Sequence, residues 1–391
     1  MQLDRLDYTG RQFGRKKGQG RMAEASVTAA NEKQRQAWLS GAMPGVERVR
    51  PGLWSIPVPI PINPLRYVLV YAFEVPGGVV IVDAGWNTEE AFGALDSGLN
   101  VAGYRIADVK AVLVTHLHPD HYGLAGRVRE ASGAWVGLHP ADARLLHERY
   151  DDEAMNVLIE RQRELLVRCG VPDLKAEELA GASKVIREHV SMAAPDRLIE
   201  DAERLDLPGW NLRAIWTPGH TPGHLCFVEP DRKLLFTGDH VLPRITPAVA
   251  VHPQSTQNPL AEFLDSLHAV RKLDVDEVMP AHEFRFLELA GRVDYMIGHH
   301  EARLAEIEEA VTETPGLSCW EITTRLTWSR PWGTMLAYQQ RSANNETLAH
   351  LVWLEGRGAL SRVPGEPDLW FPDEASSTRR DFTMGAMRGA T

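Results

Sequence analysis

The stretch VLVTHLHPDHYGLAG, residues 112–126, places three histidines and one aspartate within six positions, directly after an apolar run that predicts a buried strand. His116 and His118 are separated by one residue, so in an extended backbone their side chains point the same way and can bind one metal ion. Asp120 and His121 follow in a turn and can face a second ion. Because burying so many polar groups without a partner costs free energy, the cluster predicts a metal site.

Further histidines and aspartates follow other short apolar runs that read as strands. WTPGHTPGHLCF carries His220 and His224 on turns rich in Gly and Pro, LLFTGDHVL ends its run at Asp239, and VDEVMPAHEF ends its run at His282. Loops that carry a site at one edge of a sheet have this arrangement. These residues are therefore candidates for the remaining ligands of a dinuclear centre.

Five motifs occur in a fixed order along the chain: IVDAG, THLHPDH, TPGHTPGH, FTGDH and PAHEF. In this order, over about residues 50 to 290, they resemble the metallo-β-lactamase superfamily, and more narrowly its glyoxalase II-like hydrolases. The resemblance implies an α+β fold. Its core is an αββα sandwich, in which two sheets face each other and helices cover the outside.

The resemblance also implies seven ligands for two divalent metal ions, with zinc as the first choice and iron or manganese as alternatives. The ligands would be His116, His118 and His220 for the first ion, Asp120, His121 and His282 for the second, and Asp239 as the bridge between them. Asp120 and Asp239 would also take part in catalysis, because Asp120 can steer the attacking hydroxide that bridges the ions, or relay its proton.

Four other residues in or near these motifs are candidates for supporting roles rather than for metal ligands. Asp83 in IVDAG would orient a ligand by hydrogen bonding. His224 lies beyond the usual ligand position, so a structural turn contact and a supporting role at the site both stay open. His240 follows the bridging aspartate, and two alternatives stay open for it: it lines the pocket, or it lies outside the pocket wall. Asp142 is expected to organise a strand-to-helix junction.

The resemblance leaves the scissile bond open. Metallo-β-lactamases proper tend to carry cysteine where this chain has Asp239, and flavodiiron relatives tend to carry glutamate where it has His118. Hydrolysis of thioesters or related carboxylic esters is the leading hypothesis. The alternative is a phosphodiesterase or endoribonuclease, and lactonase, β-lactamase, sulfur dioxygenase and non-catalytic binding functions rank lower.

The chain divides into four parts. They are an N-terminal arm (1–45), the catalytic domain (46–290), a winged-helix-like domain (291–371) and a mobile tail (372–391). We expect the winged-helix-like domain to wall the active site as a packing element or to form a homodimer contact. In the adjoining helical segment we expect His299 and His300 to open a helix and to face solvent.

A helical insertion over about 141–196 interrupts the strand pattern and is long for a connection between strands. Its apolar residues lie at near-helical spacing, so one apolar face has to cover another surface. Packing of this face on the sandwich stays open, but we expect the face, including Leu158 and Leu165, to roof the metal site. The preferred small-molecule substrate would then have a hydrophobic acyl or aromatic portion.

The composition excludes several classes of protein. The 391 residues carry a net charge of −11, and no basic stripe appears near the C-terminus, so we expect no nucleic-acid partner. The N-terminus lacks the apolar core of a secretory signal, and no apolar run reaches the ~18 residues of a membrane span. The three cysteines are far apart and odd in number, which fits a reducing compartment. We therefore expect a soluble, cytoplasmic enzyme without a membrane partner.

Overall fold

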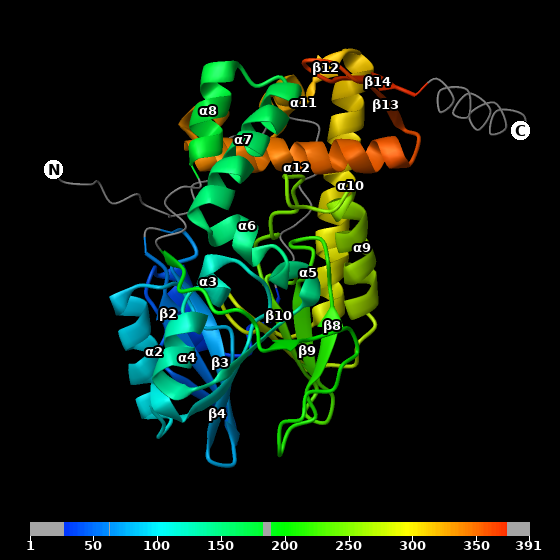
Figure 1. Cartoon of the computed structure of the whole chain (residues 1–391). Coiled ribbons are helices and arrows are strands. Elements are labelled where there is room, and N and C mark those ends of the chain that lie inside the picture. The colour runs from blue at the N-terminus through cyan, green and yellow to red at the C-terminus, as the bar shows by residue number, and fades with distance from the viewer. Residues whose placement is uncertain (1–26, 62, 183–188, 374–391) are drawn as a thin grey trace, which may run out of the picture.

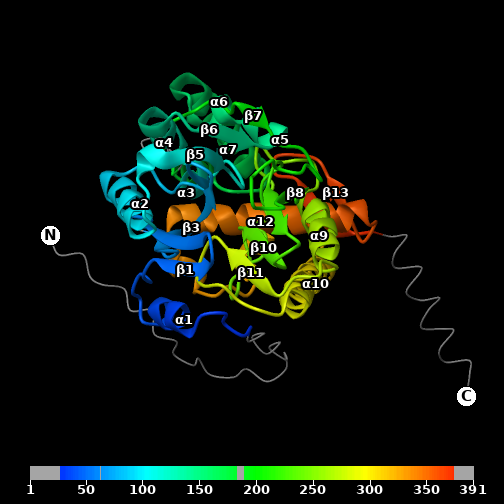
Figure 2. The ribbon, with the colours of Figure 1, turned by 90° about the horizontal axis from the view of Figure 1, so that it is seen from below.

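The computed structural model describes residues 27–61, 63–182 and 189–373. Two sheets lie face to face, and helices cover the outer side of each (Figures 1 and 2). This agrees with the expected αββα sandwich. Of the expected N-terminal arm, the described part contains α1 (Glu32–Leu39), and most of the expected tail lies outside the described residues.

The first sheet has seven strands in the order of the chain. Their bounds are β1 (Glu47–Arg50), β2 (Leu53–Pro59), β3 (Tyr67–Val75), β4 (Gly78–Val82), β5 (Val109–Leu113), β6 (Trp135–Leu138) and β7 (Arg197–Leu198). The pairs from β1 to β4 are antiparallel, and those from β4 to β7 are parallel. All of β4 is buried, which explains why its sequence is a continuous apolar run without alternation.

The second sheet has four strands in the order β11-β10-β9-β8. Their bounds are β8 (Arg213–Trp216), β9 (Leu225–Glu229), β10 (Leu234–Gly238) and β11 (Glu277–Pro280). Only β10 and β11 pair in parallel. Aromatic rings fill the space between the sheets: the ring of Phe236 lies 5.1 Å from that of Tyr71 and 5.0 Å from that of Phe73. These contacts join the sheets into one core.

Four helices form the outer layers. On the first sheet lie α2 (Glu89–Val101) and α4 (Ala125–Ser132), and on the second lie α9 (Pro259–Val270) and α10 (Leu289–Glu313) (Figure 1). Short elements fill two connections, namely η1 (Ile106–Asp108) before β5 and α3 (Pro119–Tyr122) after it. The first turn of α3 carries Asp120 and His121, so this short helix fixes two of the predicted ligands.

The expected helical insertion lies between β6 and β7. It contains α5 (Pro140–Ala143), α6 (Leu146–Tyr150), α7 (Asp152–Arg168) and α8 (Asp173–Gly181). In Figure 1 these helices lie above the edge of the sandwich at which β10 ends. The insertion therefore lies at that edge of the sandwich.

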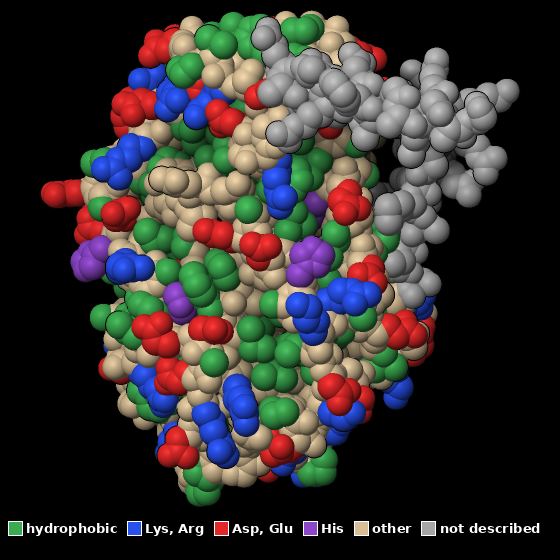
Figure 3. Space-filling model, turned by 90° about the vertical axis from the view of Figure 1, so that its right-hand side faces the viewer, with side chains coloured by type: hydrophobic (Ala, Val, Ile, Leu, Met, Phe, Trp, Pro, Cys, Tyr) green, Lys and Arg blue, Asp and Glu red, His purple; other side chains and the backbone are tan. Residues whose placement is uncertain are grey.

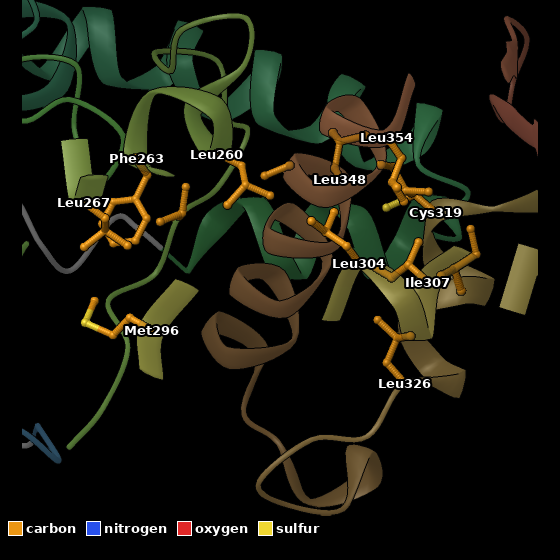
Figure 4. Close-up of a cluster of buried hydrophobic side chains, with 14 of the residues drawn as sticks. Leu260, Phe263, Leu267, Met296, Leu304, Ile307, Cys319, Leu326, Leu348 and Leu354 are labelled. Atoms are coloured by element: carbon orange, nitrogen blue, oxygen red, sulfur yellow. The ribbon is translucent and has the colours of Figure 1, made fainter. Parts of the chain in front are cut away.

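The C-terminal elements are helices and a small antiparallel sheet of order β12-β14-β13. After α10 come β12 (Leu317–Ser318), α11 (Cys319–Arg325), η3 (Trp332–Thr334), α12 (Ala337–Gly356), β13 (Leu360–Val363) and β14 (Leu369–Pro372). Figure 4 shows Phe263 of α9, Leu304 of α10 and Leu348 of α12 in one buried cluster. One hydrophobic core thus joins the C-terminal elements to the second sheet.

The expectation that His299 and His300 open a helix and face solvent is wrong. Both lie inside α10, and His300 is 1% exposed. Its Nδ1 lies 3.1 Å from Nε2 of His350 in α12, and its ring lies 5.5 Å from that of Phe263. Because α10 begins at Leu289, the imidazole of His300 lies on the buried face of the helix.

Within the described ranges, no helix is long and apolar enough to cross a membrane. On the face shown in Figure 3, Lys and Arg side chains lie among Asp and Glu side chains rather than in one basic stripe.

Candidate metal centre

The predicted site residues meet at one edge of the sandwich. Asp83 follows β4, the histidine-rich segment 116–121 follows β5, Asp239 follows β10 and His282 follows β11. The loop between β8 and β9 adds His220. Because β4 pairs in parallel with β5, and β10 with β11, the ends of each pair lie side by side. The two sheets then bring the two pairs together.

The first group of candidate ligands contains three histidines. The nitrogens that His116, His118 and His220 offer all lie within 4.8 Å of one another. Nδ1 of His118 lies 3.0 Å from Nε2 of His116 and 3.1 Å from Nε2 of His220. Burial holds the pKa of His116 and of His118 well below the usual range, so both rings are neutral, as metal-binding imidazoles must be.

The second group contains Asp120, His121 and His282, whose ligand atoms also lie within 4.8 Å of one another. Oδ2 of Asp120 lies 3.3 Å from Nε2 of His282 and 3.7 Å from Nε2 of His121. Both imidazoles are fully buried.

Asp239 lies between the two groups. Its Oδ1 lies 3.1 Å from Nε2 of His282 and 3.5 Å from Nε2 of His121, whereas its Oδ2 lies 3.6 Å from Nε2 of His220. One carboxylate oxygen therefore faces each group. This is the geometry that a bridging ligand requires.

The atoms that face the centre fit divalent metal ions. Nε2 of His121, Nε2 of His282 and Oδ1 of Asp239 are buried and form no hydrogen bond within the described structure. Unsatisfied buried nitrogen and oxygen atoms are costly unless a cation binds them. Imidazole nitrogens with carboxylate oxygens suit zinc, iron or manganese. The residues present therefore fit two such ions.

Asp83 orients His121. Its Oδ2 accepts a hydrogen bond from Nδ1 of His121 at 2.8 Å, and its Oδ1 accepts one from the Thr115 amide at 2.8 Å. The proton on Nδ1 leaves Nε2 of the imidazole with its lone pair toward the centre. Asp83 has a φ of 62°, in the left-handed region. Such backbone strain in a non-glycine residue is typical of functional sites.

Backbone carbonyls orient two further imidazoles. Nδ1 of His282 donates to the carbonyl of Tyr67 at 2.9 Å, and Nδ1 of His220 donates to that of Ala248 at 2.8 Å. In the neutral form of each ring, the proton on Nδ1 leaves Nε2 with its lone pair toward the centre.

His224 and His240 lie behind the ligands. Nε2 of His224 accepts a hydrogen bond from the Asp239 amide at 3.2 Å, and its Nδ1 lies 2.8 Å from the hydroxyl of Thr217. His224 therefore helps to fix the backbone of the candidate bridge. The ring of His240 is buried, lies 5.0 Å from the ring of Phe263, and is not among the residues that line the cavity at the site.

Asp142 lies at the predicted junction between β6 and α5, and it also contacts two distant loops. Its carboxylate accepts hydrogen bonds from the Leu117 amide at 2.9 Å, the Thr221 hydroxyl at 2.9 Å and the Gly223 amide at 2.6 Å. It thereby connects the two loops that carry the first group of histidines. Burial raises the pKa of Asp142 to about 6. Nothing in its local sequence signals these long-range contacts.

A cavity of about 200 Å³ opens beside His118 and His220. Its wall is formed by the insertion, the segment 248–254 and α12. The insertion and α12 contribute Arg149, Met155, Leu158, Ile159, Gln162, Ala180, Arg341, Ser342 and Asn345.

Leu165 is not in this wall, contrary to the expectation for the roof. It borders a separate cavity with Cys169 and Leu348. Leu165 lies seven residues after Leu158, about two helical turns along α7, where C-terminal elements cover the helix.

Comparisons with known proteins identify one family and several similar solved structures. The family described as Metallo-beta-lactamase superfamily matches residues 63–282. A metallo-beta-lactamase family protein from Thermus thermophilus is 32% identical, with a TM-score of 0.72, and the match covers 83% of this chain and 100% of that one. A beta-lactamase domain protein from Burkholderia ambifaria has a TM-score of 0.73 at 24% identity over 89% of this chain and 99% of that one, which shows a shared fold.

Fungal relatives match a shorter segment. The lactamase-like protein vrtG of Penicillium aethiopicum is 31% identical over 150 residues, which are 38% of this chain and 46% of that protein. The lactamase-like protein nscB of Aspergillus fumigatus is 33% identical over 141 residues, 35% of this chain and 39% of that protein. The match thus spans less than half the length of these relatives.

Proposed function

The chain belongs to the metallo-beta-lactamase superfamily and is a metal-dependent hydrolase, and we propose that it cleaves thioesters or related carboxylic esters with a hydrophobic acyl or aromatic portion. The observation that carries this proposal is the cavity beside His118 and His220. Met155, Leu158 and Ile159 of α7 give it an apolar side, against which an acyl chain or a ring can pack.

Two divalent ions, with zinc as the first choice, would polarise the carbonyl oxygen and lower the pKa of a bound water. We propose that His116, His118 and His220 hold one ion, that Asp120, His121 and His282 hold the other, and that Asp239 contacts both. The two ring contacts of Asp120 favour its ionised form: burial opposes ionisation, but His121 and His282 outweigh it and lower the pKa of the carboxyl group. We propose that this carboxylate orients the attacking water.

We also propose that the C-terminal elements form a winged-helix-like module that walls the active site instead of reading nucleic acid. Arg341, Ser342 and Asn345 of α12 line the same cavity as the candidate ligands, which supports this role. Residues 301–391 contain more Asp and Glu than Lys and Arg, which is unfavourable for binding a phosphate backbone.

A hydrolysis screen tests the proposed function. The protein loaded with zinc would be assayed with aryl and medium-chain thioesters, lactones, β-lactams and phosphodiesters, while elemental analysis measures bound metal. We expect close to two ions per chain and the highest kcat/KM for thioesters or esters. A higher kcat/KM for phosphodiesters would favour the alternative nuclease-type function and overturn the proposal.

Leu158→Glu tests the apolar wall. Burying a leucine side chain contributes about 1.5 to 3 kcal/mol, so loss of this contact is expected to raise KM for the best hydrophobic substrate about 10- to 100-fold. Bound metal should stay at the wild-type level, because Leu158 contributes no ligand atom. The measurements are steady-state kinetics and elemental analysis.

Val157→Glu is the matched control, because Val157 lies on the same helix but is 53% exposed. It introduces the same charge away from the cavity and should leave KM unchanged. Equal turnover of hydrophilic and aromatic thioesters by the wild-type protein would contradict the role of α7 in substrate binding.

A further inference from the structure

The cavity beside the candidate metal centre contains two guanidinium groups. Arg149 comes from α6 and Arg341 from α12, and both line the cavity together with the apolar residues of α7. Among the described residues that line it there is no Asp or Glu. The nearby carboxylate of Glu148 is exposed, lies 3.5 Å from the amide nitrogen of Gln254 and does not belong to the wall.

Backbone and amide oxygens of the described residues accept hydrogen bonds from both guanidinium groups. Nη1 of Arg341 donates to the carbonyls of Leu179 and Ala180, at 3.1 and 3.4 Å, near the C-terminal end of α8. Nη1 of Arg149 donates to Oε1 of Gln254 at 3.3 Å. None of these three acceptors carries a negative charge.

The charges of the two arginines affect the pKa values of Arg341 and of His252. Burial, followed by the charge of Arg149, lowers the pKa of Arg341 to about 10, so Arg341 remains protonated at neutral pH. Burial, followed by both arginines, lowers the pKa of His252 in the same wall to about 3, so its imidazole is neutral. The wall therefore has a net positive charge.

Two like charges in a partly buried space repel each other, and an anion between them relieves this repulsion. A guanidinium group presents five N–H donors in a planar fork that matches the oxygens of a carboxylate or phosphate. Such charge-assisted hydrogen bonds are about twice as strong as neutral ones. The same cavity offers an apolar side from Met155, Leu158 and Ile159.

We propose that Arg149 and Arg341 bind an anionic group of the substrate, a carboxylate or a phosphate, so that the preferred substrate carries both a hydrophobic portion and an anion. This inference rests on the proposed hydrolase function, whose substrate it defines more closely. The anion would bind in the same cavity as the scissile carbonyl group, in which α6 and α12 contribute one guanidinium each.

Matched substrates test this inference. The S-phenyl thioester of octanedioic acid with a free second carboxylate would be compared with its neutral methyl ester, and with a chain of equal length that ends in a phosphate. We expect the wild-type protein to have an about 10- to 100-fold higher kcat/KM for at least one anionic member than for the neutral one. The carboxylate and phosphate members then identify which anion the site prefers.

Variants of the two arginines test whether these side chains cause the preference for an anionic substrate. In Arg341→Met and Arg149→Met, the ratio of kcat/KM for the anionic and neutral members is expected to fall to within about twofold of one. Arg341→Lys should retain part of the preference, because lysine keeps the charge but not the fork. Arg161→Met, an exposed position on α7, is the matched control and should keep the wild-type ratio.

Binding measurements separate this inference from the proposed hydrolysis. Ketone analogues, in which CH₂ replaces the thioester sulfur, would be titrated into the zinc-loaded protein by calorimetry. Tighter binding of the anionic ketone, lost in Arg341→Met, would support the anion site even if no thioester were cleaved. Equal affinity of the wild-type protein for anionic and neutral ketones, or equal kcat/KM for the thioesters, would overturn it, whether or not a variant fails to fold.

Discussion

Asp239→Ala is expected to lose both metal ions and nearly all hydrolytic activity. One oxygen of this carboxylate faces His121 and His282, and the other faces His220, so its removal weakens both groups. A metal ion contributes several kcal/mol to transition-state stabilisation. At about 1.4 kcal/mol per tenfold change in rate, we expect kcat/KM to fall by about 1000-fold or more. Elemental analysis and steady-state kinetics on the same preparation measure both effects.

Asp206→Ala is the matched control, since Asp206 is exposed and lies outside the site. It should keep two ions and full activity. If Asp239→Ala retained both ions with wild-type activity, the assignment of Asp239 as the bridge would be wrong. Retention of one tightly held ion would instead show that Asp239 binds a single metal.

Asp83→Asn is expected to weaken binding at the second group by about 10- to 100-fold, the usual cost of losing a partner that orients a metal-binding histidine. The new amide can present N–H to Nδ1 of His121, where the carboxylate now accepts at 2.8 Å. The imidazole would then place its proton on Nε2, which faces the centre. Competition with a chelator of known affinity, followed for each ion, measures the change.

The choice of asparagine separates hydrogen bonding from backbone strain. Asp83 has a φ of 62°, and asparagine tolerates the left-handed region about as well as aspartate. Asp83→Gly removes the side chain but relieves the backbone, and it should also lose affinity. Wild-type metal affinity in both variants would contradict the orienting role of Asp83.

The resemblance carried by the five motifs predicted the sandwich, and local patterns predicted that the candidate ligands converge at one edge. Apolar runs of β-rich composition marked the strands, and each polar cluster came directly after such a run. The parallel pairing of β4 with β5 and of β10 with β11 then brings Asp83, Asp239 and His282 to one edge. The local patterns placed these residues at one edge, and the resemblance supplied the role expected of each.

Other features depend on contacts between distant segments. Arg149 and Arg341 reach one cavity only because α12 packs against α8, and neither belongs to a motif. Asp142 gains its role from two loops that are far away in sequence. His300 was misplaced because α10 follows Glu288, which has a φ of 69° and provides no side-chain cap, so the usual sequence signal for a helix start is missing.

The helix α12 belongs to the C-terminal elements, yet it forms part of the wall of the cavity beside the candidate metal centre. None of the seven candidate ligands lies on it. Under the proposed function, α12 would therefore contribute to substrate selection without contributing a metal ligand. Substitutions in α12 would then change which compounds are accepted while the candidate metal ligands stay intact. For protein engineering, the same separation makes Ser342 and Asn345 starting positions for libraries that redirect substrate choice.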